Sequence, residues 1–112
     1  VFTNVINPRS AVERKEEYKP TLIKKGASIG ANSTIICGNE IGRYALIGAG
    51  AVGTKSVDDY ALIVGNPVKQ IGWVSEYGHK LKFNSNNIAI CKESNQEYSL
   101  KNNSVVKVKN EY

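Results

Sequence analysis

The sequence predicts an all-β fold, a solenoid in which short parallel strands wrap around an apolar interior. Isoleucine recurs at every sixth position over five repeats, at Ile23, Ile29, Ile35, Ile41 and Ile47. On an α-helix a period of six turns successive side chains in different directions, so these isoleucines would form no apolar face. On strands, six is a multiple of the two-residue pleat, so every sixth side chain faces the same interior.

Turn-forming residues lie between the isoleucines, as a chain that changes direction within every repeat requires. Glycine directly follows three of the isoleucines, at Gly30, Gly42 and Gly48. Other positions that tolerate a positive φ angle are Gly26, Asn32, Gly38 and Gly50. The pattern therefore predicts tight turns between strands that are only a few residues long.

Three of the hexads read Ile-Gly-Ala-Asn-Ser-Thr, Ile-Gly-Arg-Tyr-Ala-Leu and Ile-Gly-Ala-Gly-Ala-Val. In these hexads the chain resembles the hexapeptide-repeat acyltransferase family. The resemblance implies a left-handed parallel β-helix, a triangular prism with three hexads in each coil. Isoleucines three hexads apart would then stack, whereas Gly53 would stack on Ile35 and leave a small void.

Residues 1–66 are expected to form this β-helix, interrupted by one loop. Pro8 cannot continue a strand ladder, and the stretch that follows it is densely charged, so a loop is predicted to leave the prism at residues 8–20. Val1 and Phe2 begin inside an apolar stretch without a capping residue. The chain is therefore expected to be a C-terminal fragment of a longer protein.

Residues 67–112 are expected to form a C-terminal cap on the prism. A short helix is predicted between Val68 and Leu81, where apolar residues can cover the open end of the core. A small β-meander is predicted beyond it, with strands near residues 88–91, 97–100 and 105–108.

Two motifs that flank the repeat are similar to a narrower group of the same family. One is Val-Phe-Thr-Asn with Asn-Pro-Arg after it, and the other is Ala-Leu-Ile-Val-Gly-Asn-Pro before Lys69. They resemble bacterial UDP-2-acetamido-3-amino-2,3-dideoxy-glucuronate N-acetyltransferases. The resemblance implies transfer of an acetyl group from acetyl-CoA to an amino group of a nucleotide-linked sugar, for a surface polysaccharide such as O-antigen. A sugar or serine O-acetyltransferase and a non-catalytic assembly module remain the alternatives.

Acetyl-CoA is expected in a groove between neighbouring prisms of a homotrimer, as the resemblance implies. The expected cofactor contacts are Ala49, Gly50, Ala51, Thr54, Lys55 and Lys69. The three small residues let the backbone approach the pantetheine arm. The two lysines suit the cofactor's phosphates, and the threonine adds a hydroxyl donor.

Acyl transfer needs a neutral amine as nucleophile and donors for the developing oxyanion. Asn4 and Arg9 are the expected contacts to the acceptor, because a guanidinium bonds a carboxylate or diphosphate in bidentate fashion. The single histidine, His79, lies beyond the repeat and is expected to have no catalytic role. The catalytic residue stays unassigned, because the resemblance places the amine-orienting asparagine upstream of Val1.

Charge and cysteine content limit the kinds of ligand and the cellular compartment that are expected for this protein. Fifteen Lys and Arg against ten acidic residues give a net charge of +5, which suits a phosphate-bearing ligand. The basic residues are spread over loops without an aromatic platform, which argues against nucleic acid. No apolar run approaches the roughly 18 residues of a membrane span. Cys37 and Cys91 show no paired spacing, so reduced thiols of a cytoplasmic protein are expected and no metal site.

Overall fold

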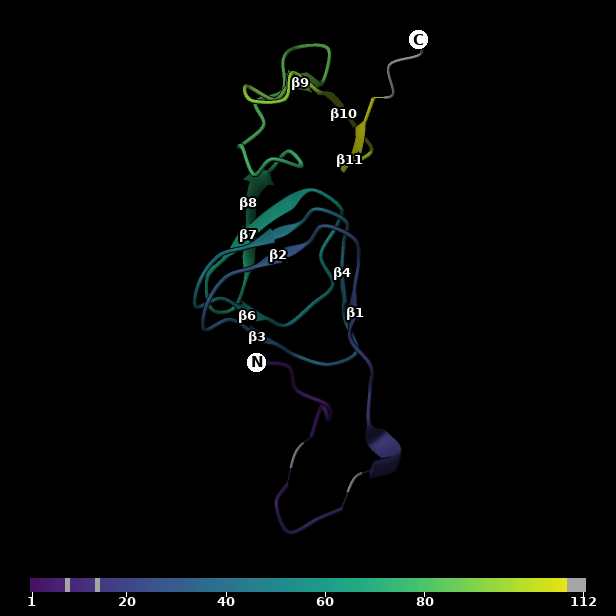
Figure 1. Cartoon of the computed structure of the whole chain (residues 1–112). Helices are drawn as coiled ribbons and strands as arrows, with labels where there is room; N and C mark the ends of the chain where they lie inside the picture. Colours follow the sequence, from purple (N-terminus) through teal and green to yellow (C-terminus); the bar gives the residue numbers. More distant parts are fainter. Residues whose placement is uncertain (8, 14, 109–112) are drawn as a thin grey trace.

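The structure, a computed structural model, describes residues 1–7, 9–13 and 15–108. Six two-residue strands build the coils: β1 (Leu22–Ile23), β2 (Ser28–Ile29), β3 (Thr34–Ile35), β4 (Glu40–Ile41), β5 (Leu46–Ile47) and β6 (Val52–Gly53). Each pairs in parallel with the strand three places along the chain, so one coil takes three strands. Figure 1 shows these strands as the walls of a prism, which confirms the predicted all-β solenoid.

The interior follows the stacking that three hexads per coil predict. Ile23 pairs with Ile41, Ile29 with Ile47 and Ile35 with Gly53. Ile35, Ile41 and Ile47 are at most 1% exposed, whereas Ile23 on the first coil is 37% exposed. The expected void at Gly53 is wrong, because Cδ1 of Ile35 lies 3.1 Å from the place a Cβ on that glycine would take.

A third coil continues the stack although the hexad spacing breaks. Val57 follows Gly53 by four residues instead of six, yet it bridges in parallel to Ile41. Six residues later Ile63, in β7 (Ala61–Val64), pairs with Ile47. The corner before Val57 is thus two residues shorter than a regular one, and the interior register is kept.

The helix predicted between Val68 and Leu81 is wrong. The chain there forms β8 (Lys69–Trp73), which runs antiparallel to β7 and is the edge strand of the wall made by β2, β5 and β7. A strand in this place satisfies backbone groups along the open edge of β7, which a helix would leave unpaired. The one helical turn in the described residues is a 3-10 turn, η1 (Lys15–Glu17), in the loop that leaves the prism.

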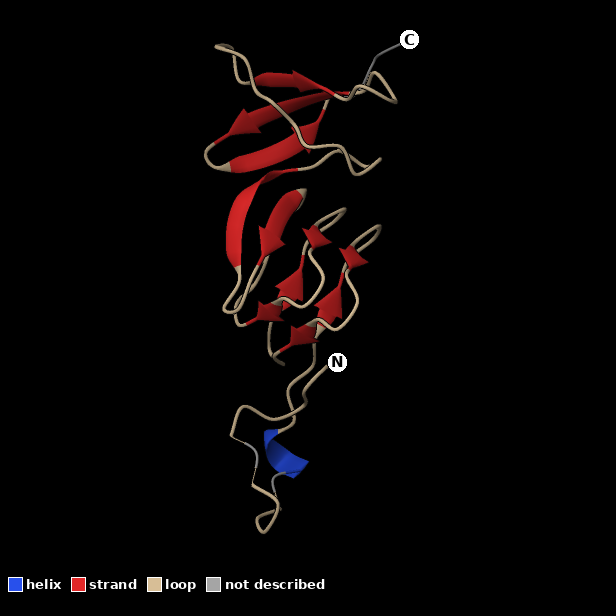
Figure 2. Ribbon diagram, turned by 90° about the vertical axis from the view of Figure 1, so that its left-hand side faces the viewer, coloured by secondary structure: helices blue, strands red, loops and turns tan. Residues whose placement is uncertain are grey.

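The predicted meander is confirmed. Its strands are β9 (Ile88–Ile90), β10 (Glu97–Lys101) and β11 (Ser104–Lys107), antiparallel with β10 in the middle. Figure 2 shows this sheet beyond one end of the prism, with the extruded loop beyond the other end. One cluster of buried residues joins this sheet to the prism and contains Tyr60, Leu81, Ala89, Cys91, Tyr98 and Val105.

A column of tyrosine rings joins the prism to this sheet. Gly26, Tyr44 and Tyr60 take the same place on successive coils, and all three have a positive φ, of 75°, 54° and 61°. The rings of Tyr44 and Tyr60 are stacked with centroids 5.7 Å apart, and Tyr98 meets Tyr60 edge-on at 5.3 Å. The Tyr44 ring lies where a Cβ on Gly26 would stand.

The substitution Gly26→Ala is expected to lower the thermal midpoint more than Gly50→Ala. Both glycines have a positive φ, of 75° and 71°, so both variants carry the same backbone strain of about 1 kcal/mol. Only at Gly26 does the new methyl collide with the Tyr44 ring, since nothing lies within 4 Å of a Cβ at Gly50. Circular dichroism measures both melts, and a near-ultraviolet change in Gly26→Ala alone would report the displaced ring. Equal losses in the two variants would contradict the steric account.

Candidate functional site

The extruded loop leaves the prism near Asn4 and returns to it near Lys19. Phe2 bridges in parallel to Ile35, and the N–H of Lys19 donates to the carbonyl of Asn4 at 2.9 Å. Asn4 therefore stands at the neck of the loop and Arg9 beyond it, and both are exposed. These two expected acceptor contacts are therefore open to solvent.

A cavity of about 410 Å³ lies at this neck, and we call it the neck cavity. Its lining residues are Val5, Ile6, Asn7, Glu16, Glu17 and Lys19. The first three come from the chain leaving the prism, and the others come from η1 and the returning chain. The sequence analysis missed this cavity, because only the closed neck brings the two stretches together.

The expected cofactor residues fall on two corners of the prism. Ala49 and Gly50 are exposed in the turn between β5 and β6. Ala51 is fully buried, its N–H donates to Gly48, and its carbonyl accepts from Thr34 at 2.9 Å. Of the three residues only Ala49 and Gly50 are exposed, and the N–H of Gly50 already donates to the carbonyl of Ala31 at 2.8 Å.

Lys69 stands over the same corner. Val64 covers Gly48, where a Cβ would meet its Cγ1 at 2.9 Å, and Lys69 pairs with Val64 across the β7–β8 ladder. The turn between β5 and β6 and the start of strand β8 thus lie at one edge of the prism. We call the edge formed by Ala49, Gly50 and Lys69 the cofactor edge.

Thr54 and Lys55 lie on the next corner, after β6, and both are exposed. Lys55 lines a second cavity of about 120 Å³ near the end of the prism, together with Val68 and Gln70. Val68 and Gln70 flank Lys69 in the chain, so the two expected phosphate-binding lysines follow different strands but lie near the same end of the prism.

No family model matches the sequence. Over 76 residues, 68% of the chain, it is 53% identical to dTDP-3-amino-3,6-dideoxy-alpha-D-galactopyranose 3-N-acetyltransferase of Aneurinibacillus thermoaerophilus. The same share of the chain is 37% identical to 2,3,4,5-tetrahydropyridine-2,6-dicarboxylate N-acetyltransferase of Staphylococcus aureus. The matched part spans 39% of the first relative's length and 29% of the second's.

One solved structure is similar to this chain in fold. It is a hexapeptide-repeat-containing acetyltransferase of Vibrio cholerae O1 biovar eltor complexed with acetyl coenzyme A. The match has a TM-score of 0.51 and 27% identity, and it covers 53% of this chain and 32% of that one. The chain belongs to the hexapeptide-repeat acyltransferase family. This confirms the resemblance read from the hexads.

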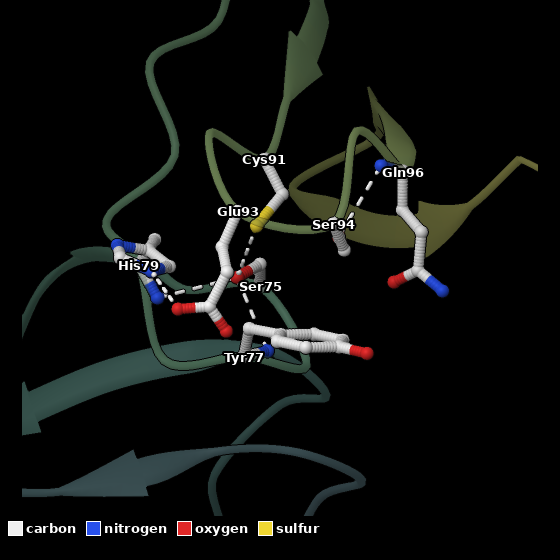
Figure 3. Close-up of polar contacts among 7 residues, drawn as sticks. All are labelled: Ser75, Tyr77, His79, Cys91, Glu93, Ser94 and Gln96. Carbon is white, nitrogen blue, oxygen red and sulfur yellow. Dashed lines mark hydrogen bonds and ion pairs between the residues drawn. The ribbon is translucent and has the colours of Figure 1, made fainter.

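In this hexapeptide-repeat chain, polar contacts join two turns of the cap (Figure 3). The Oγ of Ser75 accepts the N–H groups of Tyr77 and His79, at 3.3 and 3.2 Å. The Sγ of Cys91, from the other turn, lies 3.2 Å from the same oxygen, and both side chains are buried. The sequence analysis missed this contact, because residues sixteen positions apart show no spacing signal.

Burial alone would raise the pKa of the Cys91 thiol, but hydrogen bonds outweigh it. Hydroxyls of Ser75 and Ser94 and the backbone N–H groups of Ser94 and Glu93 lower this pKa from 9.0 to about 7. A thiolate at Cys91 is thus held by donors rather than by a cation. Within the part of the chain that the structure describes, no group of three or more His, Cys, Asp or Glu is arranged to hold a metal ion.

His79 lies at the edge of these contacts, on the cap. Its Nε2 is 3.1 Å from Oε1 of Glu93, and both side chains are exposed. The ring faces a carboxylate of its own cap, so it contacts neither the cofactor edge nor the neck cavity.

Over the described residues, no helix is long and apolar enough to cross a membrane.

The low pKa of Cys91 predicts a pH-dependent stability. The native thiol loses its proton near pH 7 and the unfolded thiol near pH 9, so between these values the unfolded chain binds more protons. This contribution to stability is therefore complete above pH 9 and is lost as pH falls through 7. Thermal melts at pH 7 and 9 should show a larger rise for the natural protein than for Cys91→Ser. The control Cys37→Ser, at another buried thiol, should keep the rise, and a rise unchanged in Cys91→Ser would refute the assignment.

Proposed function

We propose that this hexapeptide-repeat chain belongs to an N-acetyltransferase that moves an acetyl group from acetyl-CoA to an amino group of a nucleotide-linked sugar. The observation that carries the proposal is the 53% identity to an enzyme that acetylates the 3-amino group of a dTDP-linked sugar. Such sugars are building blocks of bacterial surface polysaccharides, and we assign the enzyme to that synthesis. Both free thiols, Cys37 and Cys91, are buried, which suits the reducing cytoplasm.

The cofactor edge suits an extended pantetheine arm. Ala49 and Gly50 have small side chains, so a ligand can approach the backbone closely. Lys69, over the same edge, carries a flexible ammonium suited to the phosphates of CoA. In this assignment residues 1–66 supply most of the groove, and the cap of residues 67–112 supplies the lysine.

Thr54 and Lys55 reach the same cofactor only across a groove between two prisms. They lie one corner away from Ala49 and Gly50, so they cannot flank an arm bound along that edge of their own chain. We place the corner with Lys55 on one chain of a homotrimer against the cofactor edge of its neighbour. The division of the expected contacts between two corners therefore supports a groove shared by two subunits.

The acceptor amine must be neutral when it attacks the thioester. Asn4, at the neck of the loop, can accept a hydrogen bond from the amine, and Arg9 can meet the diphosphate. His79 is paired with Glu93 on the cap, so no residue of this chain is assigned as the base.

Thiol release from acetyl-CoA tests the proposal in the protein expressed from its natural gene. A nucleotide-linked 3-amino sugar is compared with the matching 3-hydroxy sugar. Release of CoA should depend on the amino sugar, and mass spectrometry should find one acetyl group on its nitrogen. Equal release with the hydroxy sugar would indicate an O-acetyltransferase, and no release with either would refute the proposal.

Lys69→Ala and Lys55→Ala should each weaken CoA binding by about 1 kcal/mol, or about fivefold, through loss of one exposed contact to phosphate. The loss should be smaller for pantetheine, which lacks the nucleotide phosphates, and smaller at high salt. Calorimetry measures both ligands, with the exposed Lys92→Ala on the cap as the matched control. Equal losses for CoA and pantetheine would mean that the lysines act through packing.

A further inference from the structure

The three-stranded sheet of the cap has two different faces. Paired residues of neighbouring strands lie on the same face, so the ladders of β9, β10 and β11 sort the side chains into two sets. The inner set holds Ala89, Tyr98 and Val105, which are at most 2% exposed and belong to the buried cluster shared with the prism. The other side, which we call the outer cap face, is therefore turned away from the prism. It carries Ile88, Ile90, Glu97, Ser99, Lys101 and Val106.

Apolar side chains stand on both sides of the outer cap face. Ile90 on β9 is 61% exposed, and Val106 on β11 is 55% exposed. Ser99 on the middle strand is only 8% exposed, because its short side chain lies between Ile88 and Val106. Exposed apolar residues that gather on one face mark a contact surface, whereas scattered ones do not. A second sheet packs on such a face through interdigitating side chains, about 10 Å away.

The charges of the outer cap face lie at opposite ends of its middle strand. Glu97 begins β10 and Lys101 ends it, with Ser99 midway between them. The two charged residues are about 13 Å apart along the strand. Among the described residues, no ion pair within the chain involves either of them. A partner surface with the opposite charges at the same spacing would therefore pair both.

We propose that the outer cap face binds the same face of a second copy of this chain, with the two β10 strands antiparallel. A two-fold axis that crosses the strands at Ser99 places Glu97 of each copy opposite Lys101 of the other, so two ion pairs form. It also places Ile88 and Val106 against their own counterparts, since both pair with Ser99 in the ladders. The alternative two-fold arrangement, with parallel β10 strands, brings like charges together. The charges therefore select the antiparallel arrangement.

The contact gives the cap a role in assembly that goes beyond the proposed function. A two-fold contact cannot relate subunits around a three-fold axis, so in the proposed homotrimer it would join two trimers through their caps. Three strands about 4.8 Å apart give a face of a few hundred Å². This is below the roughly 800 Å² per partner of a standard stable interface, so a single contact is weak. Several contacts between the same two assemblies strengthen one another through avidity.

Charge reversal tests the contact in the protein expressed from its natural gene. Sedimentation velocity over a range of concentrations should show a species with twice the mass of that formed by Glu97→Lys or by Lys101→Glu. Each single reversal turns both ion pairs into repelling pairs, so the dissociation constant should rise about tenfold or more. The double variant, Glu97→Lys with Lys101→Glu, again has opposite charges at the two ends of β10. It should recover the doubled mass.

A mixture of the two single variants separates this pairing from a general effect of charge. Glu97→Lys has two positive charges on the outer cap face and Lys101→Glu has two negative ones, so neither pairs with itself but each pairs with the other. The mixture should therefore form the doubled species that neither variant forms alone. Lys92→Glu, at an exposed turn of the same cap, matches Lys101→Glu in net charge and should leave the association unchanged.

Val106→Ser tests the apolar part of the contact without changing any charge. It should weaken the association, because Val106 lies in the same row as Ser99 at the centre of the contact. Val106 is exposed, so melts followed by circular dichroism should match those of the natural protein. A natural protein without the doubled species at any concentration would overturn the proposal. So would single reversals that keep the doubled mass, or a loss of association in Lys92→Glu equal to that in Lys101→Glu.

Discussion

The vertical register between coils is the constraint on which the rest of the structure depends. Ile41 lies in the middle of it, paired with Ile23 on one side and bridged to Val57 on the other. Backbone groups repeat the same steps, since Lys24 N–H donates to Ile41 and Gly42 N–H to Val57, both at 2.9 Å. Because the coils cannot slip past one another, residues far apart in sequence are fixed in columns along the prism edges. The cofactor edge is one such column, and the tyrosine column is another.

The third coil shows how strongly the interior holds that register. The corner before Val57 loses two residues, yet Val57 and Ile63 still stand over the second coil. The backbone adjusts at the surface instead, where Ser56 Oγ accepts the N–H of Glu40 at 3.0 Å. A side chain thus replaces a backbone acceptor at the shortened corner. Corners of variable length on a fixed core explain how a repeat can carry different ligand contacts on each edge.

The prism could be predicted from sequence because its signal is local, a fixed spacing of isoleucines with turn residues between them. The wrong helix at β8 had a different cause. Ile71, Trp73 and Val74 offer no clear period, and the deciding partner is the open edge of β7, a tertiary feature. The candidate site was predictable only in part, for the same reason. Single residues such as Lys69 could be named from motifs, but its place over the turn at Gly50 depends on coil stacking and on the reversal into β8.

The link between prism and cap fixes the direction of that reversal. The hydroxyl of Tyr60 donates to Glu76 at 3.1 Å, and the same carboxylate lies 3.0 Å from Nζ of Lys107 on β11. Burial, and then the nearby carboxylate, raise the pKa of Tyr60, so its hydroxyl remains a donor at any physiological pH. The N–H of Glu76 donates to the Tyr98 hydroxyl at 2.9 Å, so one residue bonds both the prism ring and the cap ring.

Since Val74 N–H also donates to the Tyr60 carbonyl at 2.8 Å, the end of β8 is pinned to the tyrosine corner. The cap therefore holds the strand that carries Lys69 by hydrogen bonds at one end and by the β7 ladder along its length, which keeps that lysine over the cofactor edge.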